Sequence, residues 1–202
     1  MNSKDLLNNS TQVAFIPTEE LAVDVESGAI TDLLGIGRKI LMTINAGTPA
    51  AGALNNVVVY ESNMATFTDP VGDEVLDAAG IDISQTTMTL HATDGVGYPL
   101  YDFDMILTSG EIVTVKERVG DLCYIRRAQR GTTATVHAGG ATARLSPRVL
   151  HTFAEISAAS LVEADLAAGS RYVRVVCTVT VDTFLTSVTG LIYLEREIPS
   201  GI

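Results

Sequence analysis

Apolar and polar residues alternate along several stretches of the chain, and the clearest of these is Arg171–Asp182, RYVRVVCTVTVD. Every second residue from Val173 to Val181 is apolar, whereas the opposite row contains Arg174 and two threonines. Successive side chains of a β-strand point to opposite faces of its sheet. The pattern therefore predicts a strand with one buried face.

The same period of two recurs elsewhere along the chain. Gly110–Gly131 contains two such runs separated by Val119-Gly120-Asp121, which predicts a hairpin: Val113 and Val115 share one face of its first strand, and Cys123 and Ile125 share one face of the second. Many short strands separated by glycine-rich turns are typical of an all-β sandwich or barrel. We therefore expect an all-β, jelly-roll-like β-sandwich, with further strands at Lys39–Gly47, Asn55–Ser62 and Leu185–Glu197.

Helix signals are few. Ser157–Gly169, SAASLVEADLAAG, has Ser160 and Glu163 at the spacing of a capping box, and Gly169 at the position of a C-terminal cap. This predicts one or two helical turns, and Gly72–Gly80 is predicted to form another.

Composition changes along the chain. Residues 1–80 and 150–202 contain smooth β-branched strands, whereas residues 81–149 hold glycine-rich turns, two of the three histidines and much of the basic charge. We expect a discontinuous β-sandwich main domain (1–80 plus 150–202) with a small β-barrel or β-module (81–149) inserted into one of its loops.

Charge and composition exclude several classes of partner. The chain has 202 residues, with 13 Lys and Arg against 24 Asp and Glu, and therefore lacks the basic stripe that nucleic-acid binding requires. No tryptophan is present, which counts mildly against glycan binding. No apolar stretch approaches the ~20 residues of a membrane span, and the N-terminus has no secretory signal. Cys123 and Cys177 each lie in an apolar run, so buried thiols are expected.

The basic segment QRGTTATVHAGG lacks the spacing of a phosphate-binding loop. Its Arg130-Gly131-Thr132 step is predicted to be a tight turn, in which glycine supplies a backbone angle that other residues resist. His137 in the same segment has no nucleophile or acid framing it, and we expect its ring to bond a nearby backbone carbonyl. No catalytic residue and no cofactor are predicted, and the chain is not expected to be an enzyme.

The histidines His91, His137 and His151 are too widely spaced for a zinc site. Asp102 and Asp104 lie two residues apart on a predicted strand, so their carboxylates would share a face. That pair is either a solvated strand edge or part of a calcium site completed from elsewhere. The first alternative is favoured, and no metal is predicted.

Arg171 and Arg174 flank the start of the clearest strand, and Arg174 lies in the row opposite the apolar one. An arginine there is either an exposed strand-face residue or a subunit-contact residue, because guanidinium groups are favoured at interfaces.

One longer segment resembles a module that recurs in structural proteins of tailed bacteriophages. That module has a strand beginning Gly-Glu, a short turn, and a second strand ending in a corner of the type RG-x-x-GT-x-A-x-x-H-x-x-G. Gly110-Glu111, Arg130-Gly131-Thr132, Ala134, His137 and Gly140 fill this pattern, although the Arg-Gly-Thr step is contracted, so either Arg127 or Arg130 matches the arginine. The flanking segments NNVVVYESNMATFTD and GSRYVRVVCTVT are also similar to segments of such proteins.

The resemblance implies a non-enzymatic virion protein, and a capsid decoration (cement) protein is the first expectation. It would bind the major capsid protein or other virion proteins as a homotrimer on the capsid surface, after synthesis in the host cytoplasm. Tail, neck or baseplate proteins and a host-surface-binding module are the alternatives, and a virion-borne hydrolase is the enzymatic one. The candidate subunit-contact residues are Arg127, Arg130, Arg171 and Arg174.

Overall fold

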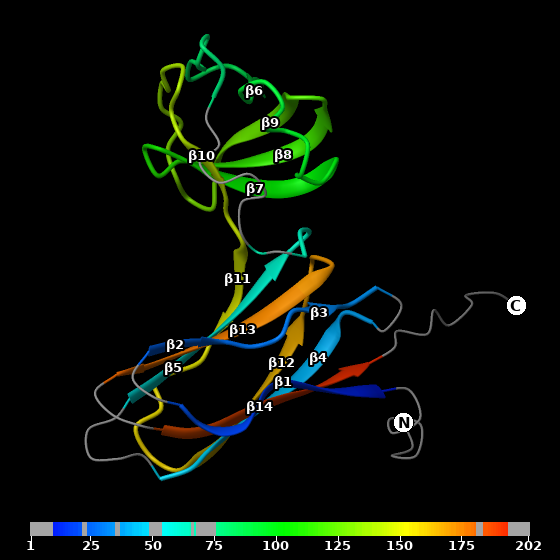
Figure 1. Cartoon of the computed structure of the whole chain (residues 1–202), viewed down its shortest axis with the longest axis vertical. Helices are drawn as coiled ribbons and strands as arrows, with labels where there is room; N and C mark the ends of the chain where they lie inside the picture. Colours follow the sequence, from blue (N-terminus) through cyan, green and yellow to red (C-terminus); the bar gives the residue numbers. More distant parts are fainter. Residues whose placement is uncertain are drawn as a thin grey trace, which may run out of the picture. The chain divides into compact units, whose positions relative to one another are not determined.

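A computed structural model describes residues 10–21, 24–34, 37–48, 54–65, 67, 76–180 and 184–193. All regular structure in these ranges is β, which confirms the predicted all-β class (Figure 1). No helix in the same ranges is long and apolar enough to cross a bilayer.

The chain divides into two compact units. The first consists of residues 1–61 and 149–202, and the second of residues 62–148. The second unit begins earlier than the change in composition at residue 81, because Met64 and Leu76 already belong to its core.

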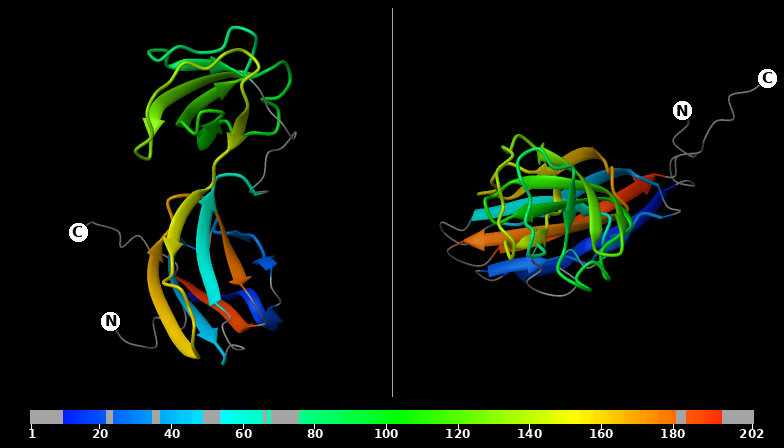
Figure 2. Two further views of the ribbon diagram at one scale, coloured as in Figure 1. Left: turned by 90° about the vertical axis from the view of Figure 1, so that its left-hand side faces the viewer. Right: turned by 90° about the horizontal axis from the view of Figure 1, so that it is seen from above.

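The first unit is a sandwich of two sheets (Figures 1 and 2). One sheet has the order β1-β14-β4-β12, and in the other, of order β11-β5-β13-β2, the short strand β3 also pairs with β13. The strands of the first sheet are β1 (Ser10–Leu21), β14 (Phe184–Tyr193), β4 (Lys39–Ala46) and β12 (Ser160–Ala167). Those of the second are β11 (Arg148–Thr152), β5 (Leu54–Ser62), β13 (Tyr172–Thr180), β2 (Asp24–Ser27) and β3 (Thr31–Asp32).

Alternate side chains of both sheets form one apolar core, as the period-two patterns predict. On β13 the predicted row is buried from Val173 to Val179, and its last member, Val181, lies outside the described residues. The opposing sheet contributes residues of β1, β4 and β14, among them Phe15, Ile40, Met42, Ile44, Val188 and Ile192.

The helix predicted at Ser157–Gly169 is wrong, because residues 160–167 form strand β12. Val162, Ala164 and Leu166 alternate along it and pack into the sandwich core, and this burial outweighs the local capping pattern. Gly169 is not a helix cap either: its backbone N–H donates to the buried carboxylate of Glu61 at 2.6 Å. In the second predicted helical segment, residues 76–80 form a turn, and residues 72–75 lie outside the described residues.

The second unit is a curled sheet of order β10-β7-β8-β9-β6 (Figure 2). The predicted hairpin is confirmed: Val119 pairs with Leu122, and Gly120, with a φ of 62°, begins the two-residue turn between them. The strands are β6 (Thr87–Thr89), β7 (Tyr101–Leu107), β8 (Ile112–Val119), β9 (Leu122–Gln129) and β10 (Ala143–Leu145).

This unit has its own apolar core, to which the hairpin contributes Val113, Val115, Cys123 and Ile125 on the faces predicted. Both cysteines are free and buried, as expected. Burial raises the pKa of the Cys123 thiol to about 12, which makes it an unreactive core residue.

The second unit is inserted between neighbouring strands of the sandwich, because β5 ends at Ser62, β11 begins at Arg148, and the two pair in one sheet. Such an insertion is easily tolerated, since the host sheet already holds its entry and exit points close together.

Candidate interaction surfaces

The four arginines proposed as subunit contacts occupy different environments. Arg127 and Arg130 belong to the second unit, and Arg171 and Arg174 to the sandwich. Each is therefore described within its own unit.

Arg127 forms a buried ion pair with Glu111. Its Nε and Nη2 donate to the two carboxylate oxygens at 2.7 and 2.8 Å, and the side chains are 9% and 0% exposed. The guanidinium also donates to the backbone carbonyls of Asp82 and Thr135. This geometry fixes three segments of the second unit around one carboxylate.

His137 completes the same cluster. Its Nε2 lies 3.0 Å from Glu111 Oε2 and 3.1 Å from Thr135 Oγ1, and its side chain is 2% exposed. The prediction that the ring bonds a backbone carbonyl is therefore wrong, because a carboxylate 26 residues away in sequence takes that place. The buried position gives His137 a structural role in holding the loop after β9.

Backbone N–H groups also bind the Glu111 carboxylate. Ala128, at a bulge with a φ of 53°, and Thr135 each donate to it at 3.1 Å. Burial alone would raise the pKa of Glu111, but the hydrogen bonds from Arg127, His137 and these two amides outweigh it and lower the pKa to about 2. Glu111 is therefore ionised at neutral pH.

The Arg130-Gly131-Thr132 turn is confirmed. Thr132 N–H donates to Gln129 O at 3.1 Å, and both Arg130 (φ 53°) and Gly131 (φ 77°) have left-handed backbone angles. Positive φ at both central positions is the signature of a type I′ turn. The segment thus bends the chain after β9.

The turn directs Arg130 to a second buried carboxylate, that of Asp104. Arg130 Nη2 and Arg148 Nε lie 2.5 and 2.9 Å from Asp104 Oδ2, and Thr114 Oγ1 donates to Oδ1. Burial would raise the pKa of Asp104, but the hydrogen bonds from Arg148, Thr114 and Arg130 lower it overall.

Asp102 and Asp104 do not converge, so the prediction that they share a face is wrong. Asp102 has a φ of 49°, which breaks the alternation, and its exposed carboxylate pairs with Lys116 at 2.5 Å instead. In the described part of the chain, no three metal-binding side chains lie together.

These contacts occupy the guanidinium groups of Arg127 and Arg130 within their own unit. Arg130 Nη1 and Nη2 also donate to the carbonyls of Pro147 and Ser146. Both arginines hold the fold of the second unit, and a subunit-contact role for them stays a prediction.

Arg171 lies on the surface of the sandwich. Its Nε and Nη2 bind Asp32 at 2.9 and 2.6 Å, and its guanidinium carbon lies 4.9 Å from the centre of the Tyr172 ring. The hydrogen bond from Arg171 is the main cause that lowers the pKa of Asp32 to about 2. The side chains of Arg171 and Asp32 are 43% and 41% exposed, so the pair is accessible to another chain.

Arg174 lies on a broader surface, here named the β5–β13 face. Its Nε atom is buried, and none of the described residues supplies it with an acceptor; the same holds for Thr180 Oγ1. The face is half-buried throughout and consists of the side chains opposite the core row on two neighbouring strands: Asn56, Val58, Tyr60, Tyr172, Arg174, Val176, Thr178 and Thr180.

The outer face of the second unit carries exposed aromatic side chains. Tyr101 on β7 pairs with Glu117 on β8, which pairs with Tyr124 on β9. The two tyrosines are 59% and 44% exposed, and nearby Leu100 and Val119 are also exposed. We call Tyr101, Glu117 and Tyr124 the tyrosine row.

The tyrosine row exists because the alternation of side chains between the two faces of the sheet is reversed at neighbouring points of β7 and β8. A bulge on β8 at Lys116 and the positive φ of Asp102 on β7 lie side by side, and the ion pair between them joins the irregularities. Alternation in β9 places Tyr124 on the face opposite Cys123 and Ile125, but nothing in the sequence of β7 marked Asp102 as the point of reversal.

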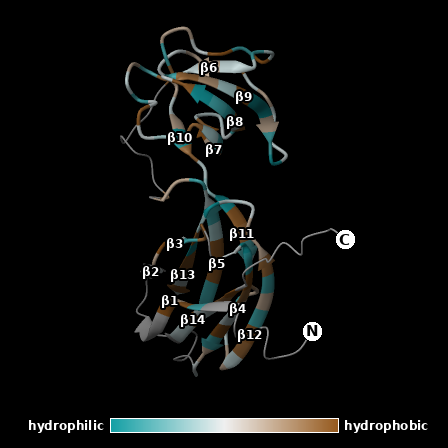
Figure 3. Ribbon diagram, turned by 90° about the vertical axis from the view of Figure 1, so that its right-hand side faces the viewer, coloured by the Kyte–Doolittle hydropathy of each residue, from teal (hydrophilic) through white to brown (hydrophobic). Residues whose placement is uncertain are grey.

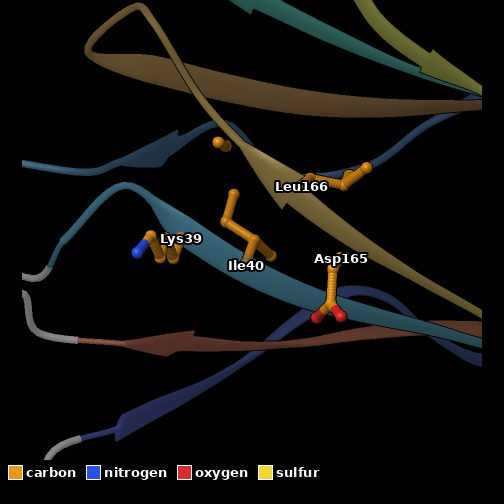
Figure 4. A pocket seen from close by; sticks show the side chains of 5 residues that line it. Lys39, Ile40, Asp165 and Leu166 are labelled. Atoms are coloured by element: carbon orange, nitrogen blue, oxygen red, sulfur yellow. The ribbon is translucent and has the colours of Figure 1, made fainter.

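A shallow hollow of about 350 Å³ lies where β4 begins and β12 ends (Figure 4). Its lining combines a lysine and a carboxylate with apolar side chains: Lys39, Ile40, Asp165, Leu166 and Ala167. None of these residues was predicted from the sequence to belong to a site.

Comparisons with protein families, with curated proteins and with solved structures gave no match.

Proposed function

We propose that this chain is a non-enzymatic structural protein of a bacteriophage virion, namely a capsid decoration protein that binds the assembled head and bridges its subunits. The resemblance of Gly110–Gly140 and its flanking segments to phage structural proteins supports this role. The all-β sandwich with an inserted β-unit is compatible with it, since both units offer strand faces for contact.

The observation that carries the proposal is Arg174 on the β5–β13 face. A buried donor without an acceptor costs about 1–3 kcal/mol, and Arg174 Nε is such a donor in the isolated chain. A carbonyl or carboxylate of another subunit would remove this cost on association. On the same face, Val58, Tyr60 and Val176 supply apolar area of the kind that packs at subunit contacts.

In this role the protein acts by mass action. A protein that binds only the assembled shell shifts the equilibrium away from disassembly, by an amount set by its concentration relative to Kd. We propose a homotrimer whose partner is the major capsid protein, because a closed symmetric assembly repeats one interface. The acidic surface implied by 24 Asp and Glu against 13 Lys and Arg keeps many copies soluble.

A host-surface-binding module of the virion is the second candidate, and the tyrosine row supports it. Two exposed rings flanking a carboxylate provide an amphipathic surface for a partner outside the particle. Fluorescently labelled protein would then stain host cells at micromolar concentration, and a Tyr101→Ser/Tyr124→Ser variant would not. A tail, neck or baseplate position is distinguished from the head by where the protein binds on purified particles.

Adding the purified protein to heads that lack it is expected to raise their melting temperature. Arg174→Ala should weaken head binding about ten-fold or more, because a hydrogen bond to a charged group contributes about 1.5–3 kcal/mol. The stability of the free chain should not fall, since Arg174 Nε has no acceptor there to lose. Calorimetry of heads and co-sedimentation measure the two effects.

Arg126→Ala is the matched control, because Arg126 is an exposed strand arginine of the second unit. It should bind heads as the unmodified protein does. Heads whose melting temperature is unchanged by saturating protein would reject the decoration role.

A further inference from the structure

Strand β12 forms an open border of the sandwich. Among the described strands it pairs only with β4, so the other side of its backbone has no strand partner in the described part of the chain (Figure 3). An unpaired edge presents N–H and C=O groups in register for another strand, and folded proteins usually protect such edges.

The other sheet borders carry such protection. β1 contains Pro17 and two register shifts, both of which interrupt strand addition. The remaining borders are short: five residues in β11, four in β2 and three each in β6 and β10. By contrast, β12 pairs with β4 over eight consecutive residues, Ser160 to Ala167, without a shift.

The side chains of β12 restrict what can pair with it. Val162, Ala164 and Leu166 point to the core, and the outward row contains Leu161, Glu163 and Asp165, all exposed. Leu161 is 66% exposed. Within the described part of the chain, neither acid has an ion pair or hydrogen bond.

A second copy of this chain is a poor occupant of the edge. If β12 of two copies paired antiparallel about a twofold axis near the middle of the strand, Glu163 of one copy would lie opposite Glu163 or Asp165 of the other. Like charges directly opposite on neighbouring strands are destabilising. The two acids therefore act against self-pairing and select a strand of the opposite charge.

We infer that the β12 edge accepts an extended segment of a partner protein in which Lys or Arg occupies two alternate positions, with apolar residues between them. The basic side chains lie opposite Glu163 and Asp165, and the apolar ones continue the core side of the sheet beside Val162 and Ala164. The hollow at the end of β12, lined by Ile40 and Leu166, receives an apolar side chain at one end of the segment (Figure 4). This inference rests on the proposed function, which it deepens by naming the chemistry of the partner.

The test uses the full-length chain and three fluorescein-labelled peptides, with binding measured by anisotropy. The first peptide is TVKVKVT, the second is TVEVEVT, and the third is TVKVKVT methylated on the backbone nitrogens of its central residues. Only the first combines the required charge with a free backbone, so it alone should bind. Its affinity should exceed that of the other two about ten-fold or more, because two cross-strand charge pairs and a hydrogen-bond ladder are involved.

Glu163→Lys/Asp165→Lys should reverse this selectivity, so that the variant binds TVEVEVT and loses TVKVKVT. The control Glu155→Lys/Asp77→Lys changes the net charge equally at exposed positions outside β12 and should keep the original selectivity. Unchanged melting curves establish that both variants are folded.

Equal binding of the methylated peptide, or equal loss of binding in both charge variants, would show general charge attraction and overturn the inference. A concentration-dependent dimer that is abolished by a Pro substitution in β12 would overturn it in favour of a second copy. The peptide measurement contains no virion. A chain that stabilises heads but fails with peptides therefore rejects the β12 inference alone, and the converse result rejects only the decoration role.

Discussion

Glu111→Gln is expected to destabilise the second unit by about 3–5 kcal/mol at pH 7, because removing one partner of a buried ion pair leaves the other charge uncompensated. The variant leaves Arg127, 9% exposed, without its carboxylate and weakens the contact to His137. Hydrogen exchange of the β8 and β9 amides measures this loss separately from the sandwich. Asp32→Asn, which removes the exposed pair with Arg171, is the control and should leave exchange unchanged.

The loss of stability caused by Glu111→Gln is also expected to depend on pH. The folded-state pKa of Glu111 is about 2, below its ordinary value of 4.5, so its contribution is complete above pH 4.5 and is lost as the pH falls toward 2. Glu111→Gln has no such group, and the stability difference between the two proteins should therefore shrink across this interval. A difference that stays constant from pH 7 to pH 2 would contradict the role given to the Glu111 carboxylate.

Gly80→Ala is expected to destabilise the second unit by about 2–5 kcal/mol, from a left-handed backbone angle and from overpacking together. Gly80 has a φ of 62°, and a Cβ there would lie 2.3 Å from the carbonyl oxygen of His137. That oxygen cannot move away easily, since it accepts from Ile81 N–H at 2.8 Å. Urea-induced unfolding, monitored by hydrogen exchange, measures this loss of stability.

Gly120→Ala provides the matched control for the clash. Gly120 has the same φ of 62°, but no atom lies within 4 Å of the position of its Cβ. The control therefore carries only the backbone cost, about 1–2 kcal/mol. Equal losses in the two variants would mean that the turns at Gly80 and His137 are not in close contact.

Local sequence patterns were sufficient to predict those strands and turns in which the pattern itself specifies the buried side chains or the backbone angles. The alternation in β13 predicts both its strand and its buried row from Val173 to Val179, because the sandwich core lies on one side only. The turns at Gly120 and at Arg130-Gly131 follow from their glycines, which adopt left-handed backbone angles without steric cost.

Long-range contacts determine the features that local patterns did not predict. Ser160–Ala167 carries a capping-box spacing, yet pairing with β4 makes it a strand. Glu111 meets His137 across 26 residues, so the partner of that histidine could not be read from its neighbours. The reversal of faces that creates the tyrosine row depends on Asp102, whose positive φ is supported by a partner on β8.

The central claim is that extended strand faces bind other subunits, and image reconstruction of heads with and without this chain tests it most directly. The account predicts additional density at the outer surface of the shell, located where capsid subunits meet and repeated with threefold symmetry. The β5–β13 face, with Arg174, should then lie against a neighbouring subunit. Reconstructions that are identical in the two preparations would contradict the account.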